Sequence, residues 1–298
     1  MTASAPDLPA PGLARAAPWA GFAALLIANY WPTLKWMEER WDEPASYMAH
    51  GWLIPPISAF LLWQMRSALR RAPRAGSAWG LAIVSVSLLL HVIAGLADVS
   101  SISSLTLVTV VLGFALALEG KAFVKVAWFP ILFLAAMVPP PEFVISKMNF
   151  SLKLVAADMA TGLLNLFGAP AIRHGSFMIF GDEKLAVGDV CSGLRSLLAL
   201  LSLSVLYAWL VREKGKGHVI GILLMAVPAA VLGNGLRIFL VSCLVMAFGQ
   251  KAVFKPLVGS WDLHLFTGAL IFAAAFACLY LVTWILDRFA PSPSGGRS

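Results

Sequence analysis

Long apolar runs constrain this chain more than any other feature of its sequence. Of its 298 residues, 60% are hydrophobic and only 12% are charged, whereas about a quarter of the residues in soluble domains are charged. A helix needs about 20 mostly apolar residues to cross a bilayer, and several runs approach or exceed that length. The sequence therefore predicts an all-α integral membrane protein, with the lipid bilayer as its main surroundings.

Eight apolar segments are expected to span the membrane, at about residues 18–34, 47–65, 78–96, 102–118, 127–138, 193–210, 218–248 and 263–286. The fifth segment is short, and Pro130 interrupts it. The prolines at 139–141 end it, because proline cannot continue a helix. The seventh segment is too long for a hydrocarbon core of about 30 Å. A break or strong tilt is therefore expected near Pro228 or at the Gly-Asn-Gly step of residues 233–235.

The longest segment between spans, residues 142–190, is expected to form an insertion before the sixth helix. Residues 143–167 have the amphipathic spacing of a helix that lies along a membrane surface. Residues 176–180 and 184–187 are typical of two short strands around a turn. The expected organisation is a disordered tail (1–16), one transmembrane domain (17–288) that contains the insertion, and a second tail (289–298).

The distribution of charge predicts the orientation in the membrane. Eight spans place both termini on one side, and the tails and loops of that side hold twelve of the 22 Lys and Arg residues. The same segments hold only four of the 15 Asp and Glu residues. This is the positive-inside pattern, so the tails are predicted to be cytoplasmic and the insertion extracytoplasmic. The net charge of +7 then needs no nucleic-acid partner.

A polar stretch at the start of the sixth span carries the candidate nucleophile, Cys191. At a helix start, unpaired N–H groups and the helix dipole favour the thiolate form of a cysteine. Ser192 and Gly193 follow directly, and Arg195 lies one turn further on the same face. The alternative is a packed, unreactive cysteine, which is the usual fate of a cysteine inside an apolar run.

Two later residues are expected at the same outer level as Cys191. Arg237, in the Asn234–Arg237 stretch, lies inside an apolar run, where an arginine is costly and marks a functional candidate. His264 opens the eighth span and suits proton transfer. A snorkelling arginine and an interfacial histidine are the alternatives. Together with Cys191 they would supply the nucleophile, acid–base and oxyanion stabiliser that acyl transfer requires.

Other sequence signals are weaker. His50, at the outer start of the second span, is expected either to face the same site or to cap its helix. The sequence has no HExxH, CxxC or Gly-rich phosphate loop, so neither a metal nor another cofactor is expected. A different class of function also fits: a multi-pass transporter or exopolysaccharide-export component without peptidase activity, with Arg237 and Asp182 or Asp189 lining a path.

These motifs resemble those of the exosortase/archaeosortase family. The resemblance rests on residues 191–196 (CSGLRS), 234–237 (NGLR) and His264, in that order, and on residues 41–55 near the N-terminus. Two departures are visible: Met48-Ala49 replaces a tighter Tyr-Ser-His spacing, and Asp189 stands near, but not at, the position where an acidic or small residue is expected. Neither departure touches the three presumed catalytic residues.

The resemblance implies a membrane thiol protease or transpeptidase with a sortase-like role in protein sorting. Its site would face the periplasm from the inner membrane, in organisms where such enzymes are associated with exopolysaccharide loci. Its substrates would be secreted proteins with a PEP-CTERM-like tail: a Pro-Glu-Pro motif, one transmembrane helix and a basic cluster. Carried over by motif, Cys191 is the nucleophile, and Arg237 and His264 are the other signature residues. Hydrolysis or transfer, and the oligomeric state, stay open.

Overall fold

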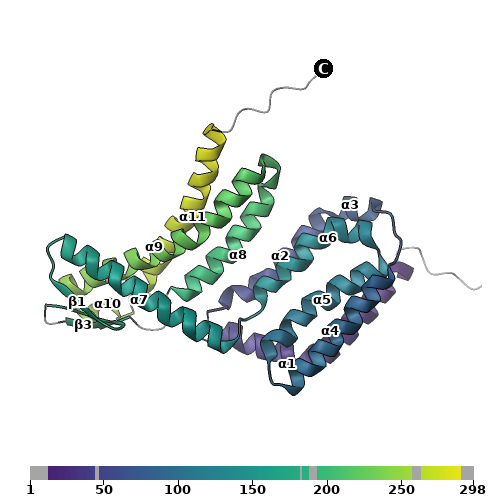
Figure 1. Ribbon diagram of the computed structural model, residues 1–298, viewed down its shortest axis with the longest axis horizontal. Helices are drawn as coiled ribbons and strands as arrows, with labels where there is room; N and C mark the ends of the chain where they lie inside the picture. Colours follow the sequence, from purple (N-terminus) through teal and green to yellow (C-terminus); the bar gives the residue numbers. More distant parts are fainter. Residues whose placement is uncertain (1–12, 44–46, 182, 188–192, 257–262, 290–298) are drawn as a thin grey trace, which may run out of the picture. The chain divides into compact units, whose positions relative to one another are not determined.

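The computed structural model describes residues 13–43, 47–181, 183–187, 193–256 and 263–289. The chain packs as two compact units (Figure 1). Unit 1 contains residues 1–43 and 51–139, and unit 2 contains residues 44–50 and 140–298. The expectation of one transmembrane domain over 17–288 stays a prediction.

Unit 1 is a bundle of helices joined by short loops. Its elements are α1 (Leu13–Asp42), η1 (Ala49–Leu53), α2 (Ile54–Gln64), α3 (Arg66–Arg71), α4 (Ala78–Leu96), α5 (Ser100–Leu118), α6 (Lys121–Phe133) and η2 (Leu134–Met137), where η1 also includes residues of unit 2. Helices α4 and α5 are in close contact, because a Cβ on Gly80 would lie only 2.2 Å from the backbone nitrogen of Ala117.

Hydroxyl groups join α1, α4 and α5 inside this bundle. Tyr30 and Thr106 share a hydrogen bond of 3.0 Å, and both side chains are buried. Ser103 contacts Thr33 at 2.6 Å and His91 Nδ1 at 2.8 Å. Such interhelical bonds hold apolar helices together where burial against lipid gives little net driving force.

Unit 2 combines three packed helices with a small sheet. Its elements are α7 (Glu142–Leu166), β1 (Ala171–His174), β2 (Phe177–Phe180), β3 (Glu183–Ala186), α8 (Leu194–Leu210), η4 (Arg212–Lys214), α9 (Lys216–Phe248), α10 (Gln250–Val253) and α11 (Leu263–Phe289). Helices α8, α9 and α11 pack side by side (Figure 1). The three strands are antiparallel in the order β1-β2-β3.

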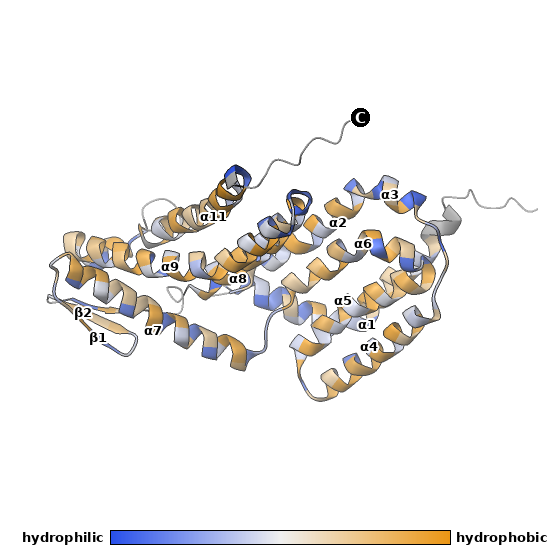
Figure 2. Cartoon of the chain, turned by 45° about the horizontal axis from the view of Figure 1, so that its top comes forward, coloured by the Kyte–Doolittle hydropathy of each residue, from blue (hydrophilic) through white to orange (hydrophobic). Residues whose placement is uncertain are grey.

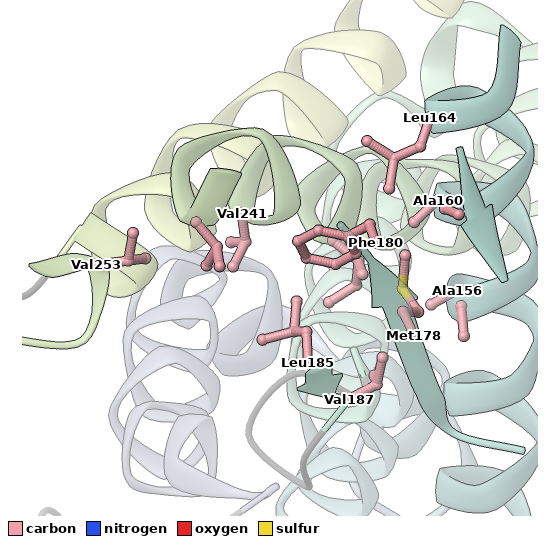
Figure 3. Packing of buried hydrophobic residues seen from close by; sticks show 13 residues of the cluster. Ala156, Ala160, Leu164, Met178, Phe180, Leu185, Val187, Val241 and Val253 are labelled. Carbon is pink, nitrogen blue, oxygen red and sulfur yellow. The ribbon is translucent and has the colours of Figure 1, made fainter. Parts of the chain in front are cut away.

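Two hydrophobic clusters divide unit 2 along α9. The helix cluster joins α8, α9 and α11 through buried residues that include Leu197, Ala230 and Leu279. The sheet cluster joins the strands to α7 and to the later part of α9. Figure 3 shows Met178 and Phe180 of β2 beside Ala156 and Ala160 of α7. Helix α9 therefore belongs to both clusters and fixes one relative to the other.

The eight expected spans are not all confirmed. Within the described residues, four helices are long and apolar enough to cross a membrane: α4, α5, α9 and α11. The pair formed by α6/η2 and α7 would count as a fifth span only if the two were one broken span, and α8 is apolar yet shorter. Figure 2 shows hydrophilic residues gathered at helix ends, for example at α3 and between α8 and α9. A multi-pass, mainly helical membrane protein with a small sheet is confirmed.

Several element boundaries differ from the sequence-based expectations. Helix α1 continues to Asp42 instead of ending near residue 34, and Pro130 lies inside α6 without ending it. Helix α9 is one continuous helix of 33 residues through Pro228 and the Gly-Asn-Gly step, so the expected break is wrong. The two expected strands are present as β2 and β3, and a third strand, β1, precedes them.

Candidate functional site

The start of α8 is fitted closely against α9. Gly193 is the N-cap residue of α8 and has φ +80, in the left-handed region that favours glycine. A Cβ at this position would lie 2.3 Å from Cγ of Asn234. Two independent reasons therefore require glycine at position 193: the backbone conformation and the close approach of the Asn234 amide. The contact joins two of the motifs that the sequence singled out.

The Gly-Asn-Gly step of residues 233–235 gathers neighbouring helices around α9. A Cβ on Gly233 would lie 3.1 Å from Ile271 of α11, and one on Gly235 would lie 2.6 Å from Met159 of α7. The Asn234 side chain between them meets the start of α8. Small residues allow such close helix approach in membranes. The step therefore packs against three neighbours, two through its glycines and one through the Asn234 side chain.

Arg237 lies one turn after Asn234 and is only 7% exposed. Its guanidinium packs against α11, where a Cβ on Gly268 would lie 3.0 Å from Arg237 Cζ. A snorkelling arginine extends its charged end into water, so the burial of Arg237 between two helices favours a role inside the protein. Counted from Lys216, Arg237 is about 32 Å along α9, close to the thickness of a hydrocarbon core.

A small pocket lies beside Arg237, between α8, α9 and α11, and has room for about one water molecule. Its polar side chains are Ser196, Asn234 and Arg237. The remaining lining is apolar or backbone: Leu200, Ala230, Gly233, Gly268, Ile271, Phe272 and Ala275. The pocket therefore leaves space for one small group beside the Arg237 guanidinium, with Ser196 and Asn234 as its other polar neighbours.

The site sits at the junction of the two hydrophobic clusters of unit 2. On α9, Ala230 belongs to the helix cluster and Ile238 to the sheet cluster. Asn234 and Arg237 occupy the turn between them. Both side chains are buried, so their positions are fixed from both sides of the junction.

The structure describes only some of the residues that the sequence predicts to be catalytic. Cys191 and Ser192 lie outside the described residues, as do Asp182 and Asp189. His264 is in the first turn of α11, four residues before Gly268, and therefore one helical turn from the glycine that contacts Arg237. The structure describes the backbone of His264 but not its side chain.

Two supporting residues contact α8 or lie on it. Arg195 is in the first turn of α8 and is partly buried. His50 Nε2 lies 3.2 Å from Oγ of Ser202, which is on the face of α8 that carries Arg195, two turns further along. His50 thus approaches the helix that begins at the site.

Some contact residues were not identified from the sequence. Gly268 receives the guanidinium of Arg237, and its only signal was a small residue one turn after His264. The Tyr47 hydroxyl accepts a hydrogen bond of 2.8 Å from Asn149 Nδ2, which ties the N-terminal motif to α7. Within the described part of the chain, no group of three or more His, Cys, Asp and Glu side chains could hold a metal ion.

Comparison with known proteins gives one match. The family model for transmembrane exosortase (Exosortase_EpsH) matches residues 36–281, which is most of the chain and includes every motif discussed above. The curated proteins and the solved structures give no match. The chain therefore belongs to the transmembrane exosortase family.

Proposed function

We propose that this protein is a membrane-embedded thiol peptidase or transpeptidase that removes the C-terminal sorting tail of secreted proteins. The tail would carry the Pro-Glu-Pro motif, transmembrane helix and basic cluster that the family implies. The reaction would take place at the periplasmic face of the inner membrane. The observation that carries the proposal is the convergence of three elements: the start of α8 meets Asn234, and Arg237 meets the first turns of α11.

The proposed reaction is an acyl transfer in two steps. The Cys191 thiolate attacks the scissile carbonyl and forms a tetrahedral oxyanion. Arg237 stabilises this negative charge, together with backbone N–H groups at the start of α8. The intermediate collapses to a thioester as His264 donates a proton to the leaving amine.

The second step releases the product from the cysteine. His264, now neutral, accepts a proton from an acceptor, whose oxygen or nitrogen attacks the thioester carbonyl. The Cys191 thiolate leaves, and the enzyme returns to its starting state. Water as acceptor gives hydrolysis, whereas an amine or hydroxyl on a cell-surface molecule gives transfer.

Substitution of Cys191 tests the proposal directly. Cys191→Ser and Cys191→Ala should abolish processing of a tagged, tail-bearing substrate, measured as the loss of the shorter product on a gel. Cys278→Ser is the matched control, since Cys278 is an exposed cysteine in the apolar helix α11, and it should process normally. Full processing by both Cys191 variants would refute the nucleophile.

The transporter alternative makes a different prediction for the same thiol. A membrane-impermeant thiol reagent applied from the periplasmic side should label Cys191 and block processing if Cys191 is a reactive outer thiolate. A transporter or export component would not process the tail, so labelling of Cys191 would have no processing to block. Substitutions at mid-membrane polar residues such as His91 would abolish function instead.

A further inference from the structure

The two edges of the small sheet differ. With the order β1-β2-β3, both β1 and β3 are edge strands. An edge strand exposes backbone N–H and C=O groups that can pair with another chain. Which groups point outward follows from the register and from one hydrogen bond that extends the ladder.

Val187 N donates to the carbonyl of Ser176 over 2.9 Å. In the observed register, Val187 lies opposite Ser176 and Leu185 lies opposite Met178. Hydrogen-bonded and non-hydrogen-bonded pairs alternate along antiparallel strands. Leu185 and Val187 therefore direct their backbone groups toward β2, and Lys184 and Ala186 direct theirs outward, away from the sheet.

The β1 edge is closed at Ala171 by a side chain. Asn165, at the end of α7, accepts from Ala171 N at 2.8 Å and donates to Ala171 O at 3.1 Å. The same alternation assigns outward backbone groups to Ala171, so Asn165 satisfies them in both directions.

The β3 edge is open in the part of the chain that the structure describes. There, no group pairs with the outward N–H and C=O of Lys184 and Ala186, and both residues are exposed. The side chains of Leu185 and Val187 anchor the strand in the sheet cluster (Figure 3). The β1 edge is thus capped at Ala171, whereas β3 has no capped position among the described residues and is presented to solvent on a fixed strand.

The open edge is closely linked to the candidate site. Ile238, directly after Arg237, packs in the same cluster as Leu185. Ala186 precedes Cys191 by five residues, so their Cα atoms are at most about 17 Å apart. A chain laid along β3 would therefore reach the candidate nucleophile within a few residues.

We propose that β3 binds the substrate polypeptide as an added strand, through the outward backbone groups of Lys184 and Ala186. The occupant is an extended segment next to the scissile bond, and this inference rests on the proposed function. Strand addition provides affinity through main-chain hydrogen bonds and leaves side chains to set specificity.

The exposed face of the sheet continues this surface. Ile172 and Ile179 face each other across β1 and β2 and are 63% and 37% exposed. The Lys184 ammonium lies 4.8 Å from the ring centre of Phe177 on the same face. Apolar side chains on this face of the added strand would pack beside the exposed side chains of the sheet and shield them from water.

Hydrogen exchange tests the contact itself. Full-length Cys191→Ser protein in nanodiscs would be mixed with a tagged secreted protein that carries the tail, and with the same protein lacking the tail. The amides of Lys184 and Ala186 should exchange more slowly only with the tail-bearing protein. The Leu185 amide, already paired with β2, should change little.

Proline variants test the contact in catalysis. Proline at an outward edge position removes one N–H without breaking the ladder. Ala186→Pro should raise the KM for the tail-bearing protein about 3–10-fold, the effect of losing one hydrogen bond. Arg173→Pro removes an outward N–H from the opposite edge strand, β1, and is the matched control, with an unchanged KM. Labelling of Cys191 by a small thiol reagent should be equal in all three proteins.

The outcomes separate this inference from the proposed function. If wild-type protein processes the tail and Cys191→Ser binds it without protection at Lys184 and Ala186, strand addition is wrong and the peptidase proposal stands. An unchanged KM in Ala186→Pro would also overturn it. If wild-type protein does not process the tail, the proposed function fails first, and strand addition fails with it.

Discussion

Arg237 is positioned by the lack of a side chain opposite it. Gly268 leaves room for the guanidinium on α11, and Asn234 lies one turn away on the same helix. A buried guanidinium with five donors in a planar fork suits an oxyanion better than a flexible ammonium does. This difference between arginine and lysine can be measured.

Arg237→Ala should lower kcat for tail processing about 10²–10³-fold, as expected for the loss of one oxyanion donor. Arg237→Lys should recover only part of the rate, because it restores the charge but not the fork. Arg212→Ala, which removes an arginine stacked on Trp209 elsewhere in unit 2, should process normally. A wild-type kcat in Arg237→Ala would exclude the proposed role, provided that gel filtration shows a folded protein.

Gly193 shows how strongly one residue can be constrained. Its positive φ disfavours any other residue, and the Asn234 amide occupies the space that a Cβ would need. In the structure the approaching group is a side chain from α9, which single-sequence reasoning could not identify, because the two residues are far apart in the chain.

At the scale of elements, α9 organises unit 2 through its small residues. Gly235 is buried against Met159 of α7, and the nearest atoms to a new Cβ would include Met159 Cβ at 3.0 Å. That atom cannot move without moving α7. The helix–helix distance is therefore set by the absence of a side chain at position 235.

Gly235→Ala should destabilise the protein by about 1–3 kcal/mol, since overpacking outweighs the gain in helix propensity. The measurement is thermal unfolding in detergent, followed by circular dichroism. Gly217→Ala is the matched control in the same helix. Nothing lies within 4 Å of its new Cβ, so it should be neutral or slightly stabilising. Equal unfolding temperatures for the two variants would contradict the packing argument.

Elements with uniform hydropathy were predicted best. The expected span at 78–96 coincides with α4, and that at 102–118 nearly coincides with α5. Both are apolar runs that end at polar loops, so hydropathy and helix boundaries agree. In α1 they disagree, because the helix continues as a polar extension to Asp42, where Lys35 pairs with Glu38 at 2.6 Å.

The missed features are set by contacts that hydropathy and residue spacing do not reveal. Strand β1 has no clear alternation, and it is fixed by Asn165 and by pairing with β2. The convergence of Arg237 with Cys191 and His264 was predicted from residue types and span positions and stays a prediction, whereas the contact of Arg237 with Gly268 is seen in the structure. The glycine itself carried no chemical signal, so only the structure could identify it.

At the scale of the whole molecule, ion pairs join helix ends that the sequence predicts to lie on one side of the membrane. In unit 1, Arg74 pairs with Glu119 at 2.9 Å, which brings the start of α4 and the end of α5 together. In unit 2, Asp287 contacts Lys214 at 2.5 Å and His218 at 2.9 Å. The positive-inside count assigns all of these residues to the cytoplasmic side.

Topology reporters fused after Arg74 and after Phe180 should report opposite sides of the membrane. A periplasmic alkaline phosphatase and a cytoplasmic fluorescent protein give complementary readings at each position. A fusion after Lys214 is the control and should agree with the Arg74 fusion. If the Arg74 and Phe180 fusions report the same side, the predicted orientation and the periplasmic site are both wrong.

The continuity of α9 has a consequence for which substrates can be cut. One unbroken helix joins the cluster of membrane-spanning helices to the sheet, with Arg237 at a fixed height of about 32 Å from its first residue. Under the proposed reaction, α9 sets the level in the bilayer at which the scissile bond must lie. A tail helix anchored in the same bilayer brings its scissile bond level with Arg237 only when its apolar length matches. Adding or removing one helical turn of the tail would shift that bond by about 5 Å, so the enzyme would select tails by length as well as by sequence.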